Sequence, residues 1–115
     1  MSNGYNPKPN AVTVNLLYNG ISRQPSNQLN RPQFGSAKFS VAVQGKPVSY
    51  QWLRNGVRLN NGTNVNGTVI GGANSRKLTL TNLKVADKGR YSVMAMWPDG
   101  SVTSDPAALT VKPSR

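Results

Sequence analysis

Apolar and polar residues alternate along several short stretches of this chain, which is the pattern of half-buried β-strands. The alternation is regular over residues 36–44, 48–53, 77–81 and 89–96, and a last strand is predicted over 102–111. Asp105-Pro106 interrupts that last stretch, which predicts an edge position or a bulge, because proline cannot donate a ladder hydrogen bond. No stretch has the period of a helix of normal length, so the pattern predicts an all-β domain.

Turn-forming residues separate the predicted strands. Residues 45–47 and 97–100 predict turns, and Asn55-Gly56 predicts a tight hairpin, because both residue types accept positive φ. After the hairpin we expect a short edge strand at 57–59. Residues 60–75 are rich in Asn and Gly and predict a loop with one weak strand at 68–70.

The N-terminal third of the chain has a different composition. Residues 1–10 are polar and predict an extended arm, because they cannot bury enough apolar surface to fold alone. Residues 11–18 predict a first strand, and residues 19–35, rich in turn and breaker residues, predict a long irregular connection. We therefore expect three parts: the arm over 1–10, a partner-docking segment over 11–35, and the core of the domain over 36–115.

Three short motifs have a spacing that is specific for one architecture. They are VAVQG at 41–45, YQWLRNG at 50–56 and DKGRYSV at 87–93. Together with LTL at 78–80, they resemble the strands and the tyrosine corner of immunoglobulin-like domains, closest in style to the intermediate set. The resemblance covers residues 36–112 and implies a Greek-key β-sandwich of about seven strands.

The resemblance also implies the core of the sandwich. Trp52 would be its central tryptophan, and the Tyr91 hydroxyl would bond to the backbone just upstream. Val41 and Val93 stand where the family has its disulfide, so Trp52 would pack on two branched apolar side chains. The family's corner aspartate often pairs with an arginine, which implies a pair between Asp87 and Arg76. The core residues implied in this way are Val41, Trp52, Leu80, Asp87, Tyr91 and Val93.

The chain has no cysteine, and its first residues have no apolar stretch of the kind found in secretory signals. We therefore expect a complete small gene product that is made and folded in a cytoplasm. Cysteine-free immunoglobulin-like domains without signal peptides resemble those on the virions of tailed bacteriophages, where they decorate capsids, tails or fibres. This resemblance implies a non-enzymatic capsid decoration protein, displayed on the capsid or tail exterior and bound to the major capsid protein or another virion protein.

The charge of the chain points to the kind of partner. Fourteen Lys and Arg face three Asp, which gives a formal net charge of +11. A charge of about 2–8 is enough to keep a small domain soluble, so the excess predicts an acidic partner or surface. The alternative is that the charge only keeps the protein soluble. The candidate partner-binding residues are Lys8, Arg23, Arg31 and Trp97.

Trp97 has two interpretations that the sequence leaves open. It lies at the tip of the last predicted hairpin, where it would dock a partner or stack on a sugar or a base. Alternatively, its side chain would fold over the end of the core.

Catalysis is not expected of this chain. It contains no His, Cys or Glu, and its three Asp are scattered along the sequence. It therefore offers neither the usual general acids and bases nor a set of metal ligands, and no catalytic, metal-binding or cofactor-binding residue is predicted. No run of about 18 apolar residues is present, so we expect no membrane insertion. Asn61-Gly62-Thr63 and Asn66-Gly67-Thr68 are formal glycosylation acceptors, which an Asn-rich chain produces by chance.

Three hypotheses for function follow, of which we favour the first. It is capsid decoration, through the N-terminal segment and the basic surface. The second is a basic nucleic-acid-binding module, for which the chain lacks a recognised motif and a face that interleaves aromatic and basic residues. The third is an adhesion or carbohydrate-binding module on a virion, which would bind a cell-surface glycan through Trp97 and the Asn-rich loops.

Overall fold

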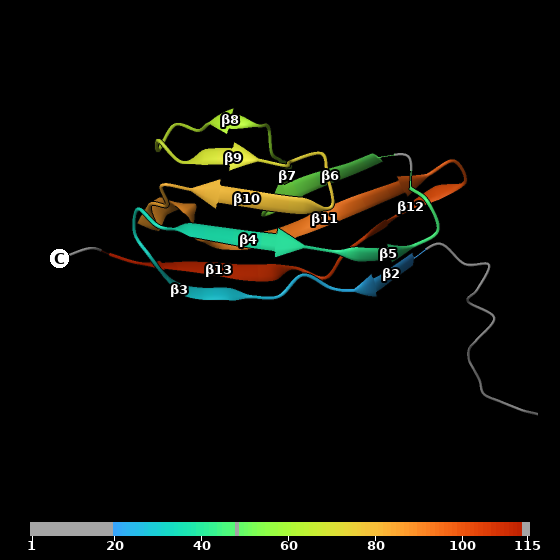
Figure 1. Ribbon diagram of the computed structural model, residues 1–115, viewed down its shortest axis with the longest axis horizontal. Coiled ribbons are helices and arrows are strands. Elements are labelled where there is room, and N and C mark those ends of the chain that lie inside the picture. The colour runs from blue at the N-terminus through green and yellow to red at the C-terminus, as the bar shows by residue number, and fades with distance from the viewer. Residues whose placement is uncertain (1–19, 48, 114–115) are drawn as a thin grey trace, which may run out of the picture.

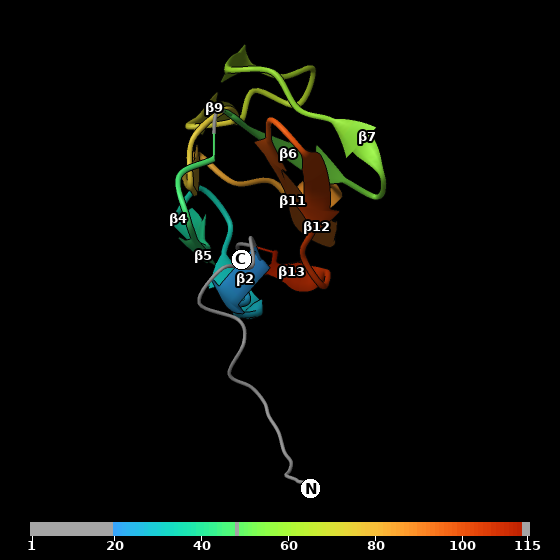
Figure 2. The ribbon, with the colours of Figure 1, turned by 90° about the vertical axis from the view of Figure 1, so that its right-hand side faces the viewer.

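The computed structural model describes residues 20–47 and 49–113, which form two facing β-sheets (Figures 1 and 2). One sheet has the order β4-β10-β9-β8, and the other has the order β3-β13-β11-β6-β7, with β12 also paired to β11. A two-stranded sheet of β2 and β5 continues along the same long axis. This arrangement confirms the predicted immunoglobulin-like β-sandwich. The predicted arm over 1–10 and the predicted strand over 11–18 lie outside the described residues.

The described chain contains 12 short strands, more than the seven or so expected, and their bounds are as follows. The strands are β2 (Gly20–Arg23), β3 (Gln28–Pro32), β4 (Ser36–Ser40), β5 (Ala42–Gln44), β6 (Ser49–Arg54), β7 (Val57–Arg58), β8 (Gly62–Thr63), β9 (Val69–Gly71), β10 (Lys77–Thr81), β11 (Gly89–Trp97), β12 (Gly100–Thr103) and β13 (Ala107–Lys112). One 3₁₀ turn, η2 (Val85–Asp87), precedes β11.

The core lies between the two sheets, and alternation along the strands fills it. In β11 every second side chain is buried, and Val93 lies opposite Trp52 of β6. The Phe39 ring of β4 packs against Trp52 at a centroid distance of 6.2 Å and stacks on Tyr91 at 5.1 Å. Full burial of one large apolar side chain stabilises a fold by about 1.5–3 kcal/mol. The six residues expected in the core are all 4% exposed or less: Val41, Trp52, Leu80, Asp87, Tyr91 and Val93.

The predicted irregular connection over 19–35 is wrong, because this segment contains two strands. β2 pairs antiparallel with β5, and β3 pairs parallel with β13. Among the described strands each has one partner, so turn-forming residues are tolerated there. Side chains replace some of the ladder bonds: the Asn27 side chain accepts from the Ala108 N–H at 2.8 Å, and the Thr110 hydroxyl accepts from the Asn30 N–H at 2.7 Å.

Several predicted strands are divided or shifted in the structure. The stretch 36–44 breaks at Val41. Before the break β4 pairs with β10, and after it β5 pairs with β2. The Asn-rich loop over 60–75 holds two short strands, β8 and β9, where one was expected. The hairpin prediction is confirmed: Asn55 and Gly56 have φ of 50° and 83° and join the paired residues Arg54 and Val57.

Candidate functional site

The described residues contain no group of three or more His, Cys, Asp or Glu side chains that could hold a metal ion. No helix in the same part of the chain is long and apolar enough to cross a membrane. A network of hydrogen bonds lies at the end of the sandwich where β10, η2 and β11 meet the turn between β3 and β4.

Asp87 is the centre of this end, and it is 1% exposed. Its carboxylate accepts hydrogen bonds from the Thr68 hydroxyl, from Asn64 Nδ2 at 3.1 Å and from the Lys84 N–H at 2.8 Å. Because a buried carboxylate is costly unless it is bonded, these donors hold residues 64–68 against η2. The predicted pair with Arg76 is wrong: Arg76 precedes β10, whereas the corner follows the other end of that strand.

Tyr91 and Arg54 fix the backbone of the same corner. The Tyr91 hydroxyl donates to the Asp87 carbonyl at 2.6 Å, which is the expected tyrosine corner. Arg54 Nη2 donates to the carbonyls of Ala86 and Lys88 at 2.7 and 2.8 Å. Burial raises the pKa of the Tyr91 phenol to about 12, the nearby Arg54 partly offsets this rise, and Asp87 adds to it. The corner is therefore held by neutral and charged donors on backbone carbonyls.

Phe34 lies in the turn between β3 and β4 with an unusual backbone conformation. The Gly35 N–H donates to the Pro32 carbonyl at 3.0 Å, and Phe34 inside this turn has φ of 70°. Gly and Asn usually supply such a φ, which costs other residues about 1–2 kcal/mol. Two backbone hydrogen bonds tie the turn to the corner, from Phe34 N–H to the Leu83 carbonyl at 2.7 Å and from Leu83 N–H to the Gly35 carbonyl at 3.0 Å.

The Phe34 ring gains little from the fold in return. It is 56% exposed, and Lys84 Nζ lies 5.6 Å from its centroid. Lys84 Nζ also donates to the Asn66 carbonyl at 3.0 Å, so the cation is held in place beside the ring. A cation–π contact at an exposed site contributes about 0.5–1 kcal/mol, which at most offsets the backbone cost. Stability of the fold therefore does not explain phenylalanine at this position.

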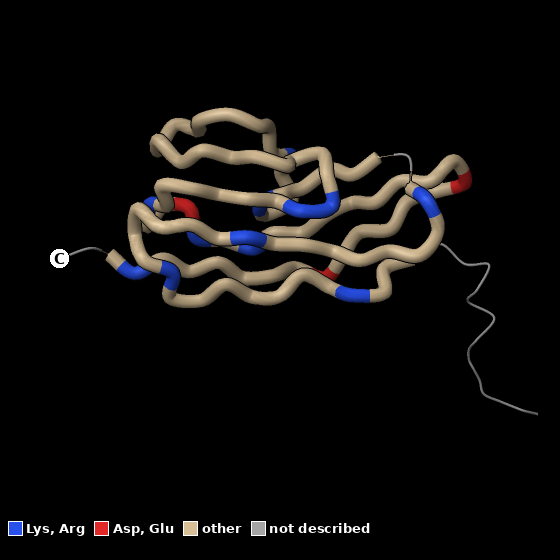
Figure 3. Tube along the Cα trace, viewed as in Figure 1, with Lys and Arg blue, Asp and Glu red and all other residues tan. Residues whose placement is uncertain are grey.

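Basic residues lie near this turn. Arg31, at the end of β3, donates through Nε to the Ser36 carbonyl at 3.1 Å, and Lys112 is exposed where its own carbonyl accepts from the Gln33 N–H at 3.1 Å. Figure 3 shows several Lys and Arg positions at the end of the sandwich where β13 finishes, and others along its length. Val85, which follows Lys84, is 37% exposed. We call the surface formed by Arg31, Phe34, Lys84, Val85 and Lys112 the Phe34 patch.

No exposed carboxylate of the described residues lies in the Phe34 patch. Asp87 is buried and bonded. Asp99 belongs to the turn between β11 and β12, at the opposite end of the sandwich in Figure 3. Asp105 precedes β13, where its N–H donates to the Gln24 side chain at 2.9 Å. The patch is therefore positively charged, with an apolar centre.

The structure separates the four residues predicted to bind a partner. Lys8 lies outside the described residues, and Arg23 ends β2, away from the patch that contains Arg31.

Trp97 is 6% exposed, so the exposed-tip interpretation is wrong and its side chain is folded inward. The reason is that Trp97 still belongs to β11, pairs with Gly100, and continues the inward alternation of Tyr91, Val93 and Ala95.

Phe34 was missed by the sequence analysis. The available signal was a large aromatic residue inside a stretch of turn-forming residues, Pro32-Gln33-Phe34-Gly35. Lys84, which contacts the ring, and Lys112, whose carbonyl accepts from Gln33, come from distant parts of the chain, and only the fold brings them to this turn.

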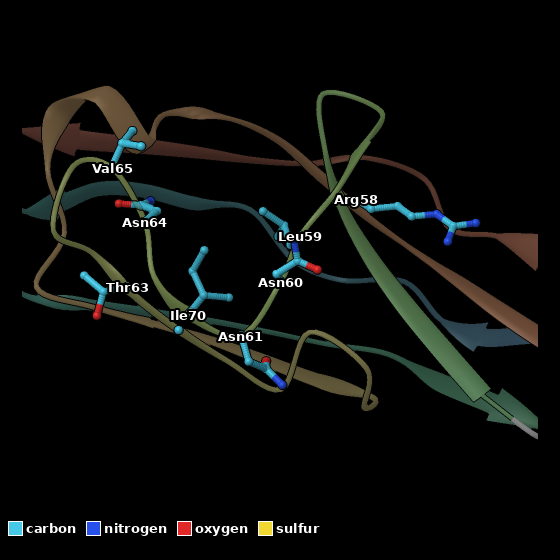
Figure 4. A pocket seen from close by; sticks show the side chains of 9 residues that line it. Arg58, Leu59, Asn60, Asn61, Thr63, Asn64, Val65 and Ile70 are labelled. Atoms are coloured by element: carbon cyan, nitrogen blue, oxygen red, sulfur yellow. The ribbon is translucent and has the colours of Figure 1, made fainter.

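A hollow of about 330 Å³ lies beside the Asn-rich loops (Figure 4). Leu59, Ile70 and Val65 supply its apolar lining, and Asn60, Asn61 and Asn64 supply amides. Arg58 extends away from the other labelled side chains.

The amides of this hollow are largely used by the fold. Asn64 Oδ1 accepts from the backbone of Asn66 and Thr68, and Asn61 Oδ1 accepts from Ala73. No aromatic ring lines the hollow for stacking on a sugar. Thr68 of the second formal glycosylation acceptor is fully buried on Asp87, so this threonine has a structural role.

Comparisons with known proteins agree with the immunoglobulin-like fold. A family model described as "Immunoglobulin I-set domain" matches residues 21–111. The solved titin domains Z1Z2 in complex with telethonin are similar at 27% identity and a TM-score of 0.66, over 84% of this chain and 48% of that one. Titin M4 is similar at 25% identity and a TM-score of 0.64, over 82% and 95%. The tandem Ig repeats of Dlar share the fold at 19% identity and a TM-score of 0.68, and this chain spans 49% of their length. No curated protein sequence matches the chain.

Proposed function

Because the chain belongs to the immunoglobulin I-set family, we propose that it is a non-enzymatic binding module that attaches to an acidic protein surface. Domains of this kind are in general structural or adhesion modules. The observation that carries the proposal is the distribution of charge. Fourteen basic residues face three Asp, and one end of the sandwich presents Lys and Arg with no exposed described carboxylate beside them.

A related protein supports the choice of a protein partner. The titin Z1Z2 domains were solved in complex with telethonin, which is another protein. Complementary charge steers the encounter of two proteins and fixes their relative orientation. A net charge of +11 would serve that purpose on a partner of opposite sign.

The specific partner we propose is the outer shell of a phage capsid, with the protein displayed on the virion exterior. This choice rests on the absence of cysteine, on the net charge and on the proposed arm over 1–10. The similar structures named above are titin and Dlar domains and give it no support of their own. In this form of the proposal, the arm and the segment over 11–35 seat the protein on the shell.

Co-sedimentation with DNA-emptied capsids, at low and high salt, tests this partner. We expect saturable binding that survives high salt, and weaker binding of a variant that lacks residues 1–10. Circular dichroism of that variant controls for folding. Unchanged binding would remove the arm from the proposal, and no binding would remove the capsid.

Nucleic acid is the competing ligand for a basic surface. Phosphate contacts make affinity fall by orders of magnitude between about 50 and 200 mM salt. Binding to free DNA with such a salt response, together with no binding to capsids, would replace the proposed function by the nucleic-acid hypothesis.

A further inference from the structure

We infer that the Phe34 patch is the attachment site of this protein, and that it binds an acidic peptide segment with an apolar side chain between its carboxylates. The inference rests on the proposed function and deepens it by naming the site and the chemistry of the partner. The apolar side chain would cover Phe34 and Val85, and the carboxylates would meet Arg31, Lys84 and Lys112.

The first argument is that Phe34 is unfavourable for the fold that contains it. Its φ of 70° lies in the left-handed region, where phenylalanine is a true outlier. Its ring is 56% exposed, although the turn itself is closed by backbone hydrogen bonds that any residue could make. Backbone strain of this kind concentrates at functional sites.

The second argument is that the patch is already ordered. Two backbone hydrogen bonds join Phe34 and Gly35 to Leu83, and Lys84 is held by the Asn66 carbonyl beside the ring. Next to it, the Asp87 network and the Tyr91 hydroxyl fix η2. A preorganised aromatic with Lys84 over its ring and further basic residues nearby resembles the centre and rim of a protein interface, where aromatic residues and Arg are enriched.

The third argument distinguishes a peptide from a nucleic acid. Proteins that bind single strands offer several rings on which successive bases stack. The Phe34 patch has one ring, with Lys84 over one of its faces, and its second apolar residue is the aliphatic Val85. One apolar contact between separated cations suits a side chain flanked by carboxylates.

The test is selection from a display library of random dodecapeptides on the intact protein. We expect the selected peptides to be enriched in Asp and Glu around one aromatic or aliphatic residue. Synthetic copies of these peptides should bind Phe34→Gly about tenfold or more weakly than the parent, as expected for loss of a central aromatic contact. Lys112→Gln should weaken binding as well.

Matched variants separate the patch from general charge and general surface. Lys46→Gln removes an exposed cation from the connection between β5 and β6, at the other end of the sandwich. Val69→Thr removes a 45%-exposed apolar group from β9. Both should bind the selected peptides as the parent does. Glycine accepts the Phe34 backbone conformation, and Phe34→Asn provides a second variant if the first one folds poorly.

The outcomes are distinguishable. Acidic peptides that bind Phe34→Gly as well as the parent would overturn the patch and leave an acidic partner in place. Selection of peptides without acidic residues would overturn both the patch and the proposed function. Failure to select any binding peptide would overturn both as well. Oligothymidylate could displace the bound peptides more effectively than free peptide does. If Phe34→Gly abolished that displacement, the patch would be assigned to nucleic acid and the inference would be overturned.

Discussion

Thr68 donates its hydroxyl hydrogen bond to the buried carboxylate of Asp87, and this contact joins the start of β9 to the corner before β11. The side-chain donors to the Asp87 carboxylate are thus a hydroxyl and an amide, where the guanidinium of Arg76 was expected, while Arg54 binds backbone carbonyls of the same corner. A polar group can replace an ion pair here because the carboxylate also accepts the Lys84 N–H. Three neutral donors thus meet the charge of the carboxylate directly.

Thr68→Val should be strongly destabilising for a change of one polar group. The variant removes one of the two donors to Asp87 Oδ2, and a hydrogen bond to a charged group contributes about 1.5–3 kcal/mol. Urea unfolding would measure the loss. Thr81→Val on β10 is the matched control, because Thr81 is exposed, and it should change stability by less than about 0.5 kcal/mol. Equal stability of the two variants would contradict the role given to Thr68.

Tyr91 should make the protein sensitive to alkali. Its pKa is raised from about 10 in the unfolded chain to about 12 in the folded protein. The phenol is therefore protonated more readily in the folded state, and its contribution is complete below pH 10 and is lost as pH rises toward 12. Two pKa units correspond to about 2–3 kcal/mol. Denaturation midpoints measured across this range should fall steeply.

Tyr91→Phe is the control for this pH dependence. It removes the ionisable group and the hydrogen bond to the Asp87 carbonyl, so it should be about 1 kcal/mol less stable at neutral pH. Its stability should then fall less between pH 10 and 12 than that of the parent. Parallel curves for the two proteins would show that another group causes the alkaline loss.

Phe34→Gly should leave the fold intact, with a stability equal to the parent or up to about 1 kcal/mol higher. The substitution relieves the positive φ and gives up the contact with Lys84. Leu29→Gly is the matched comparison, since Leu29 is 53% exposed in β3 at a φ that is not positive. That variant should lose about 0.5–1 kcal/mol. Thermal unfolding would show both, and a larger loss for Phe34→Gly would mean that its ring supports the fold.

Trp97→Ala should destabilise the protein by about 3–5 kcal/mol, as other truncations of a buried aromatic do. Because Trp52 is also buried, acrylamide should quench the native tryptophan fluorescence weakly and the unfolded fluorescence strongly. Strong quenching of the native state would place Trp97 in solvent. It would also restore its role as a binding residue at the tip.

The fold could be predicted from the sequence because its signals are local or regularly spaced. Alternation placed Phe39, Trp52 and Val93 inward, and the motif around Tyr91 gave the corner. β2 and β3 were not predicted, because edge strands depend on one partner and tolerate Pro and Asn. The Asp87 partner and the Phe34 patch depend on side chains that meet only after the strands have paired, and a positive φ at phenylalanine leaves no mark in the sequence.

Val41 and Val93 stand at the positions of the family's disulfide, and both are buried in one apolar cluster with Trp52. The native state therefore contains no bond that a reductant can break and no thiol that an oxidant can trap in a wrong pairing. Its equilibrium between folded and unfolded chains is independent of redox potential. The same protein should unfold at the same denaturant concentration in dithiothreitol and in air. It should refold without a disulfide isomerase or an oxidant.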